Sequence, residues 1–370
     1  MNSREPSPLT PAVNPGDTLK PPVTAYGPVG WLRKNLFNSV PNSLLTVLTV
    51  AFLWKTVPPL LQWAFVDAQW ATPSALCRQS DGACWSVISR NLRFILFGFY
   101  PYDQQWRPIV AVILLLGLIF FSRDRKYWTK PLAYAWIVGL AAMGTLMAGG
   151  VFGLSAVESS QWGGLPLTLL LAVFGLTAAY PLGVVLALGR QSRMPAVKVL
   201  CIVYIELIRG VPLISLLFMA SIIFPLFLPE GVTINKILRA QLAIILFTAA
   251  YIAEVVRGGL QAIPRGQYEA AESLGLNYYL TMRLVVLPQA LKIVIPPTVS
   301  ILISAFKDTS LVVIIALYDV LKTTQTVLSN PEWMGFSREA YLFLALFYFT
   351  GCFSMSHYSR RLEKQLSTEH

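Results

Sequence analysis

The sequence contains little charge and almost no histidine. Only 13% of its 370 residues are charged, about half the share of a soluble domain, which argues against an ordinary soluble enzyme. The only two histidines, His357 and His370, lie near the carboxyl end. Such a small number of histidines disfavours catalytic triads and zinc sites built on histidine. Neither a CxxC pair nor a GxxxxGKS/T or GxGxxG loop occurs. We therefore expect no catalytic residue, no metal and no cofactor bound by this chain.

Apolar residues, by contrast, make up 55% of the chain, and the net charge is +11. A basic chain can bind nucleic acid, but that function needs its cations gathered on one polar face. Here the cations stand in short runs between long apolar stretches, which is typical of a protein that crosses a membrane several times. We predict an all-α integral membrane protein without a nucleic-acid partner.

Eight apolar stretches are candidate membrane spans, because a helix needs about 20 apolar residues to cross a bilayer. Residues 1–42 precede the first of these stretches. Their first part is rich in Pro, Ser, Thr and Gly, which predicts a disordered tail. The second stretch, at 108–121, is shorter than the length that a membrane span needs. The eight stretches are 43–66, 108–121, 131–154, 165–189, 199–228, 237–256, 284–320 and 340–357.

The distribution of Lys and Arg sets the expected orientation, because cytoplasmic loops are enriched in both. With the amino end inside, the inside segments hold more than twice as many of these residues as the outside segments. An even number of spans then puts both termini in the cytoplasm. The outside loop at about 67–107 contains Cys77 and Cys84, which could form a disulfide in an oxidising periplasm. The alternative is two free thiols.

The most informative segment follows the sixth apolar stretch and runs from Pro264 to Ala290. Residues 269–274 have helical propensity, and Gly275 can end that helix in a left-handed cap. A second helix can resume at 278–287, with Pro288 bending it towards the membrane. Two short helices at an angle would form a projecting knob for a partner protein, although the same pattern also fits an elbow that joins two spans.

This segment resembles the EAA signature of binding-protein-dependent ABC importer permeases. The matching residues are Glu269, Ala270, Ala271, Gly275, Leu287 and Pro288, with Val285 where the family more often has Ile. The resemblance implies that the segment is a coupling helix seated in a groove of a cytoplasmic ATPase subunit. ATP and magnesium would then be used by that partner, and this chain would not be an enzyme.

Further segments at 206–212, 251–259, 266–269 and 306–311 are similar to the polar amino acid importers. The resemblance covers residues 164 to the carboxyl end. It implies a type I, MetI-like permease core of five helices at 164–358, with a coupling loop at 258–290 and a cytoplasmic tail at 359–370. The three extra helices at 43–163 look like those of the general L-amino acid permease M-type membrane subunit.

The resemblance also implies partners and a location. They are an ATP-binding subunit dimer, a second and non-identical permease forming a heterodimer, a periplasmic amino-acid-binding protein, an L-amino acid and the lipid of a bacterial inner membrane.

Charged residues inside the predicted spans must be paired or hydrated, because each costs at least about 2.5 kcal/mol to insert. Two Glu-x-x-Arg pairs, Glu206 with Arg209 and Glu254 with Arg257, form either a structural ion network or an inner gate. The i, i+3 spacing puts the two members of each pair on one helix face. Lys307 and Asp308 could complement the carboxylate and ammonium of an amino acid, or neutralise each other. The residues of the first group are Glu206, Arg209, Glu254 and Arg257, and those of the second are Lys307, Asp308, Thr309 and Ser304.

Two other classes of function fit parts of the pattern. A secondary transporter of small polar solutes, driven by an ion gradient, would show internal repeats, and only the short Glu-x-x-Arg-Gly echo is present. A membrane-embedded enzyme would need convergent reactive groups inside the spans.

Overall fold

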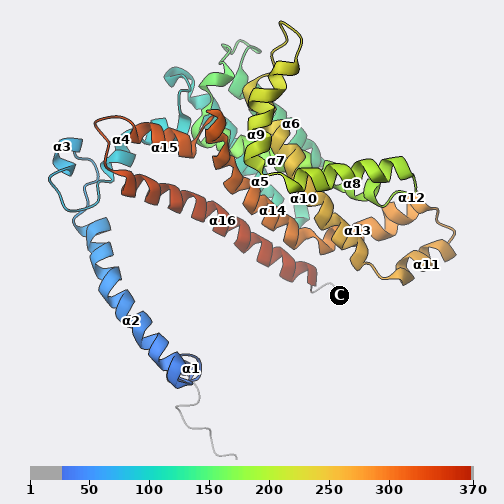
Figure 1. Cartoon of the computed structure of the whole chain (residues 1–370), viewed down its shortest axis with the longest axis horizontal. Coiled ribbons are helices and arrows are strands. Elements are labelled where there is room, and N and C mark those ends of the chain that lie inside the picture. Colours follow the sequence, from blue (N-terminus) through green and yellow to red (C-terminus); the bar gives the residue numbers. More distant parts are fainter. Residues whose placement is uncertain (1–26, 368–370) are drawn as a thin grey trace, which may run out of the picture. The chain divides into compact units, whose positions relative to one another are not determined.

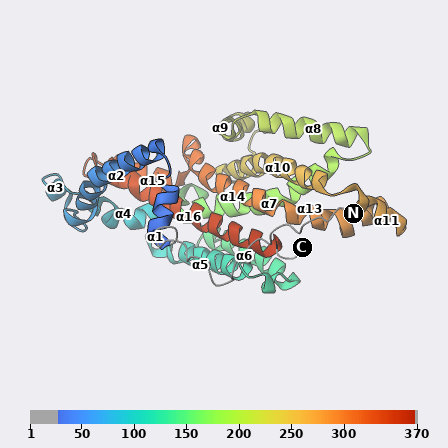
Figure 2. The same cartoon turned by 90° about the horizontal axis from the view of Figure 1, so that it is seen from below.

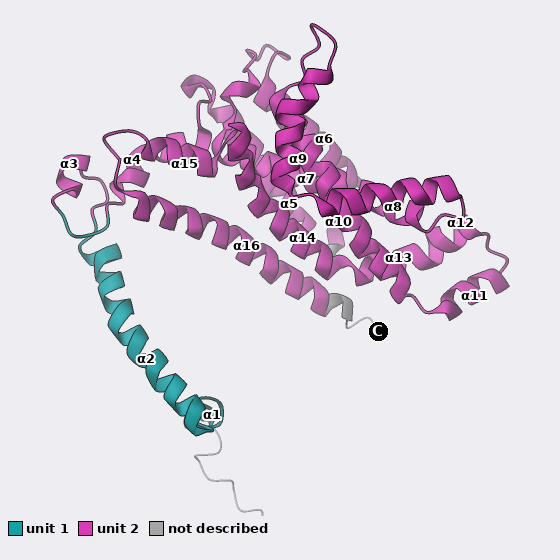
Figure 3. Ribbon diagram, viewed as in Figure 1, with its two compact units in different colours: residues 1–68, 80–83 teal, residues 69–79, 84–370 magenta. Residues whose placement is uncertain are grey.

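The computed structural model describes residues 27–367, apart from the side chains of 125 and 365–367 (Figure 1). The chain divides into two compact units (Figure 3). The first comprises residues 1–68 and 80–83, and the second comprises 69–79 and 84–370.

The first unit contains α1 (Gly27–Asn35), α2 (Val40–Leu61) and a π-helical turn, η2 (Gln62–Val66). Ser39 begins α2 by accepting a hydrogen bond from the Asn42 backbone N–H at 3.4 Å. Helix α1 lies within the tail that we predicted to be disordered. The rest of that predicted tail, residues 1–26, lies outside the described residues.

The second unit contains the remaining candidate spans. Within residues 27–367, seven helices are long and apolar enough to cross a membrane, and one bent pair of helices is an eighth candidate. The prediction of an all-α membrane protein is thus confirmed. The spans of this unit are α5 (Trp106–Ser122), α6 (Lys130–Ala148), α7 (Gly164–Arg190), α10 (Lys236–Ala262), α14 (Ile295–Asp308) with η9 (Thr309–Ile315), and α16 (Ser337–Ser367).

Shorter elements connect the spans and cover their ends. They are α3 (Ser74–Cys77), α4 (Ser86–Phe97), η3 (Tyr102–Gln104), η4 (Arg125–Tyr127), η5 (Ser159–Gln161), α11 (Arg265–Ser273), α12 (Tyr278–Leu280), η8 (Thr281–Val286), α13 (Leu287–Ile293), β1 (Tyr318–Asp319) and α15 (Val320–Leu328).

The fifth apolar stretch, predicted as one span at 199–228, is instead a bent pair. Helix α8 (Pro195–Gly210) and the segment made of α9 (Leu213–Phe218), η6 (Met219–Ile223) and η7 (Phe224–Phe227) meet at 103°. Pro212 causes the break, because a residue before proline avoids the helical region, and Val211 is extended at φ −109° and ψ 134°. A bent pair can still cross the membrane as one broken span, so the span at 199–228 stays a prediction, with a break that we did not expect.

Helices α7 and α10 form the centre of the second unit and lie side by side in both views (Figures 1 and 2). Small residues let them approach closely, as is common between helices in membranes. A Cβ on Gly183 would lie 2.6 Å from Ile252 Cγ2 and 2.9 Å from the Ala249 carbonyl oxygen. This packing fixes the two helices whose carboxyl ends carry most of the candidate site.

Candidate functional site

The segment with the EAA residues leaves the end of α10 and returns to the bundle through α13. It projects at one end of the second unit as α11, α12 and η8 (Figure 1). Pro264 is extended at φ −58° and ψ 142° and separates α10 from α11. The segment is thus a pair of short helical legs, as the sequence predicts.

Helix α11 ends as a Schellman motif. The Gly275 N–H donates to the Glu272 carbonyl at 2.9 Å, and the Leu276 N–H donates to the Ala271 carbonyl at 3.1 Å. Gly275 sits at φ +75°, a left-handed conformation that glycine adopts without strain. Asn277 then begins the second leg by accepting the Leu280 N–H at 3.0 Å. The turn between the two legs is therefore fixed by backbone hydrogen bonds.

The two alanines of the EAA triplet face different ways. Glu269 and Ala270 are exposed, whereas Ala271 is buried. Leu287 is half-buried, and Pro288 is exposed. Several large apolar side chains on the same projection are mostly exposed, namely Leu274, Tyr278, Tyr279 and Leu284.

The base of the projection is packed tightly onto α10. A Cβ on Gly259 would lie 2.9 Å from the Ala290 carbonyl oxygen and 2.3 Å from Val294 Cγ1. The Gln289 side-chain amide also donates to Gln267 Oε1 at 3.0 Å, which links α13 to α11. A force applied to α11 would therefore reach α10 through packed contacts.

Five charged side chains gather close to that base, at the carboxyl ends of α7, α8 and α10. Arg190 contacts Glu206 at 2.9 Å and Glu254 at 3.4 Å. Arg209 contacts Glu254 at 3.6 Å, and Arg257 forms a further ion pair with Glu254. Glu254 is thus surrounded by three arginines from three helices, with its side chain 24% exposed.

The structure brings the four predicted charges together but pairs them differently. Glu254 and Arg257 pair at i, i+3, as their spacing suggests. Within the described residues, Glu206 and Arg209 do not pair with each other. Arg209 instead reaches α10, where its guanidinium lies 5.6 Å from the centre of the Tyr251 ring. Sequence reasoning missed Arg190 because only the packing of α7 brings it to both glutamates.

Helix α14 carries a polar stripe that faces away from the rest of the chain. Ser300, Ser304 and Lys307 are all exposed and follow one another at helical spacing. Polar residues within a span usually face a partner helix or a water-filled cavity. The two serines and the lysine therefore form an exposed polar stripe on a candidate span.

The neighbouring residues of this segment differ in exposure. Asp308 is half-buried, and Thr309 is fully buried with its hydroxyl donating to the Phe306 carbonyl at 2.7 Å. Thr309 is therefore buried within the chain. No ion pair joins Lys307 to Asp308 in the described part of the chain, so the two charges do not neutralise each other through direct contact.

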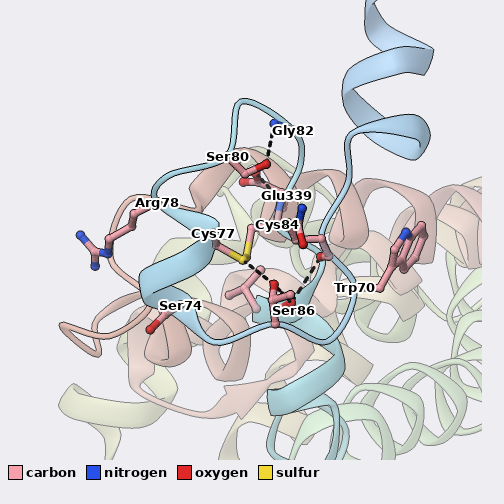
Figure 4. Close-up of a disulfide and its surroundings, with 12 residues drawn as sticks. Trp70, Ser74, Cys77, Arg78, Ser80, Gly82, Cys84, Ser86 and Glu339 are labelled. Carbon is pink, nitrogen blue, oxygen red and sulfur yellow. Dashed lines mark hydrogen bonds between the residues drawn. A yellow bond between two sulfur atoms is a disulfide. The ribbon is translucent and has the colours of Figure 1, made fainter.

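At the opposite end of the bundle, Cys77 and Cys84 are joined in a disulfide (Figure 4). The surrounding loop is tied to the segment before α16 and to the first turn of α16. Arg78 donates to the Pro331 carbonyl at 2.9 Å, and the Cys84 N–H donates to Glu339 Oε1 at 3.1 Å. Cys201 and Cys352 are free and partly buried.

Comparisons with known proteins give one consistent family. Residues 179–368 match the family described as binding-protein-dependent transport system inner membrane component. The chain is 49% identical over 345 residues to the inner membrane amino-acid ABC transporter permease protein YhdY of Escherichia coli K12, covering 91% of this chain and 93% of that protein. It is 39% identical to the glutamate/glutamine/aspartate/asparagine transport system permease protein BztC of Rhodobacter capsulatus, covering 94% and 96%.

A solved structure is also similar. It is an amino acid ABC transporter crystallised with histidines, at 30% identity and a TM-score of 0.49, covering 54% of this chain and 90% of that chain.

Proposed function

The chain belongs to the family of binding-protein-dependent inner membrane transport components, and on this premise we propose that it carries amino acids as the permease subunit of an ABC importer. The observation that carries the proposal is its 49% identity, over 91% of its length, to a permease named for amino acids. A permease of this family is not itself an ATPase, so ATP and Mg²⁺ are used by partner subunits. Nothing in the comparisons favours a secondary transporter.

We propose that α11 couples the chain to an ATPase dimer in the cytoplasm. The exposed Glu269 and Ala270, with the apolar side chains around Tyr278, supply a docking face. Movement of that face passes to α10 through the Gly259 and Gln289 contacts. Glu254, at the centre of the arginine cluster, lies on the same helix α10, so a shift of α10 relative to α7 and α8 would break and remake the ion pairs with Arg190 and Arg209 as an inner gate.

The polar stripe of α14 supports a path shared between two subunits. Ser304 and Lys307 are exposed in this chain, and a second permease would enclose them. The Lys307 ammonium would then attract the carboxylate of an amino acid during passage. The extra helices before residue 164 favour a non-identical partner, as in the M-type subgroup.

The disulfide supports the orientation. Disulfides persist in oxidising compartments such as the periplasm. The Cys77–Cys84 disulfide lies towards the amino end of α10, and α11 follows the carboxyl end of α10. With the disulfide outside, α11 faces the cytoplasm of the bacterial inner membrane, and the excess of Lys and Arg in the predicted inside segments supports a cytoplasmic location for both termini. A periplasmic amino-acid-binding protein would deliver cargo at the outer end.

The test is ATP-driven uptake of labelled amino acids by proteoliposomes that hold the co-purified complex. Glu269→Lys should abolish uptake and release the ATPase during purification. The matched control is Glu230→Lys, an exposed charge reversal in the loop at the opposite end of α10, which should leave the ATPase bound. Uptake driven by an imposed ion gradient without any ATPase would refute the proposal.

A further inference from the structure

An open groove of about 600 Å³ lies between α4 and the beginning of α5, both in the second unit. One wall carries two arginines, Arg90 and Arg93, and the other carries the aromatic and aliphatic residues where the chain enters its membrane span. The proposed function does not use this groove. It lies at the end of the bundle that holds the disulfide, far along α5 from its cytoplasmic end.

Both arginines are held in place but keep free donors. Arg93 Nη2 donates to the Tyr102 carbonyl at 2.9 Å, its Nε donates to Gln105 Oε1, and its guanidinium lies 4.2 Å from the centre of the Tyr102 ring. Arg90 Nη2 donates to the Ala71 carbonyl at 3.0 Å. A guanidinium has five N–H donors, so each arginine retains several for a ligand.

Neither arginine has an acidic partner among the described residues. Asp103 also lines the groove, but no ion pair joins it to Arg90 or Arg93 in the described part of the chain. Two cations and one anion leave the groove with a net positive charge. The spacing of the arginines, i and i+3, puts both on one face of α4, which suits an oxyanion that accepts from both.

The other wall has the residue types of a membrane interface. Trp106 and Tyr102 are 49% and 63% exposed, and such aromatic residues gather where a bilayer meets water. Ile109 follows one turn deeper in α5 and is also exposed. The groove thus joins free guanidinium donors to an apolar surface that continues down the span.

We propose that this groove binds an anionic phospholipid of the outer leaflet. The phosphate accepts hydrogen bonds from Arg90 and Arg93, the interfacial aromatic residues flank the glycerol, and an acyl chain follows the exposed face of α5. A bound lipid would brace α4 against α5 at the outer end of the extra helices. A soluble phosphate ester could use the same donors, but it would leave the apolar wall uncovered, so the membrane lipid is the favoured occupant.

The test titrates the purified complex in neutral detergent with dioleoylphosphatidylglycerol and follows binding by native mass spectrometry. Parallel titrations use dioleoylphosphatidylcholine and glycerol 3-phosphate. The variants are Arg90→Gln, the double variant Arg90→Gln/Arg93→Gln, and the control Arg338→Gln, an exposed arginine at the start of α16. Arg90→Gln alone leaves the Arg93 contacts with Tyr102 and Gln105 intact. The single variant can therefore still test the proposal if the double variant misfolds.

We expect wild type to bind phosphatidylglycerol at least tenfold more tightly than phosphatidylcholine. The double variant should lose about 25-fold in affinity, the effect of two interfacial cations, and Arg90→Gln should lose about fivefold. Arg338→Gln should match wild type. Unchanged binding in the arginine variants, equal binding of phosphatidylcholine, or saturable binding of glycerol 3-phosphate with no preference for the lipid would each overturn the proposal.

Discussion

Asp319 is a fully buried carboxyl group in the short β1 segment, outside the candidate spans that flank it. Its Oδ1 accepts the Lys322 backbone N–H at 2.9 Å and begins α15, while the Tyr348 hydroxyl donates to Oδ2 at 3.4 Å. Burial raises the pKa of Asp319 to about 6 from its ordinary value of 3.8, although these hydrogen bonds oppose the rise. Replacing Asp319 by Asn keeps a capping side chain and removes the charge.

The direction of the effect follows from the two pKa values. Between about pH 4 and pH 6 the native chain retains the proton on Asp319, whereas the unfolded chain has lost it. The free energy of unfolding therefore falls as the pH rises through this window. The pKa of Asp319 is about 6 in the native chain and 3.8 in the unfolded chain. At 1.36 kcal/mol per pKa unit, this difference lowers the free energy of unfolding by about 3 kcal/mol by pH 8.

The assay compares the thermal unfolding midpoint of wild type and Asp319→Asn in detergent from pH 4 to pH 8. Relative to wild type, the variant should become more stable as the pH rises, by about 3 kcal/mol over the range. Asp103→Asn, which removes an exposed carboxyl group, is the matched control variant. A difference between Asp319→Asn and wild type that is constant with pH would refute the reasoning.

Three further predictions follow from packing, the disulfide and the arginine cluster. Gly183→Val should destabilise the chain by about 1–3 kcal/mol through overpacking against α10, measured by thermal unfolding, whereas Gly144→Val, with open space around it, should be nearly neutral. Cys77→Ser should cost about 2 kcal/mol of stability, and a reductant should lower the wild-type unfolding midpoint but not that of the variant. Arg190→Gln should raise the ATPase rate of the complex in the absence of binding protein. A double-mutant cycle with Glu206→Gln, measured on the free energy of unfolding, should give a coupling energy of about 0.2–1 kcal/mol; a coupling energy of zero would contradict the ion pair.

The local features of the site follow from the sequence because short-range chemistry fixes them. Gly275 after the end of α11 is a helix-termination signal, and Asn277 at the start of α12 is a helix-capping signal. Both operate within a few residues. The spacing of Glu269 from Leu287 and Pro288 is likewise readable along the chain. The break at Pro212 was readable too, and we missed it because the apolar run continues through it.

Features that depend on packing between distant helices could not be predicted. Arg190 reaches Glu254 across 64 residues of sequence, and no spacing rule links them. The burial of Ala271 beside an exposed Ala270 depends on how α11 packs against η8. The burial of Asp319 requires α16 to bring Tyr348 against it, so its shifted pKa has no signal in the local sequence.

Chemical cross-linking from the two neighbouring alanines of α11 tests the coupling claim most directly. Ala270→Cys and Ala271→Cys would each be made with Cys201 and Cys352 replaced by Ser, labelled with a photoreactive maleimide and illuminated in the intact complex. The exposed Ala270 position should cross-link to the ATPase subunit and the yield should change on adding ATP, whereas the buried Ala271 position should label poorly. Failure of Ala270→Cys to cross-link to any ATPase, despite full labelling, would contradict the account.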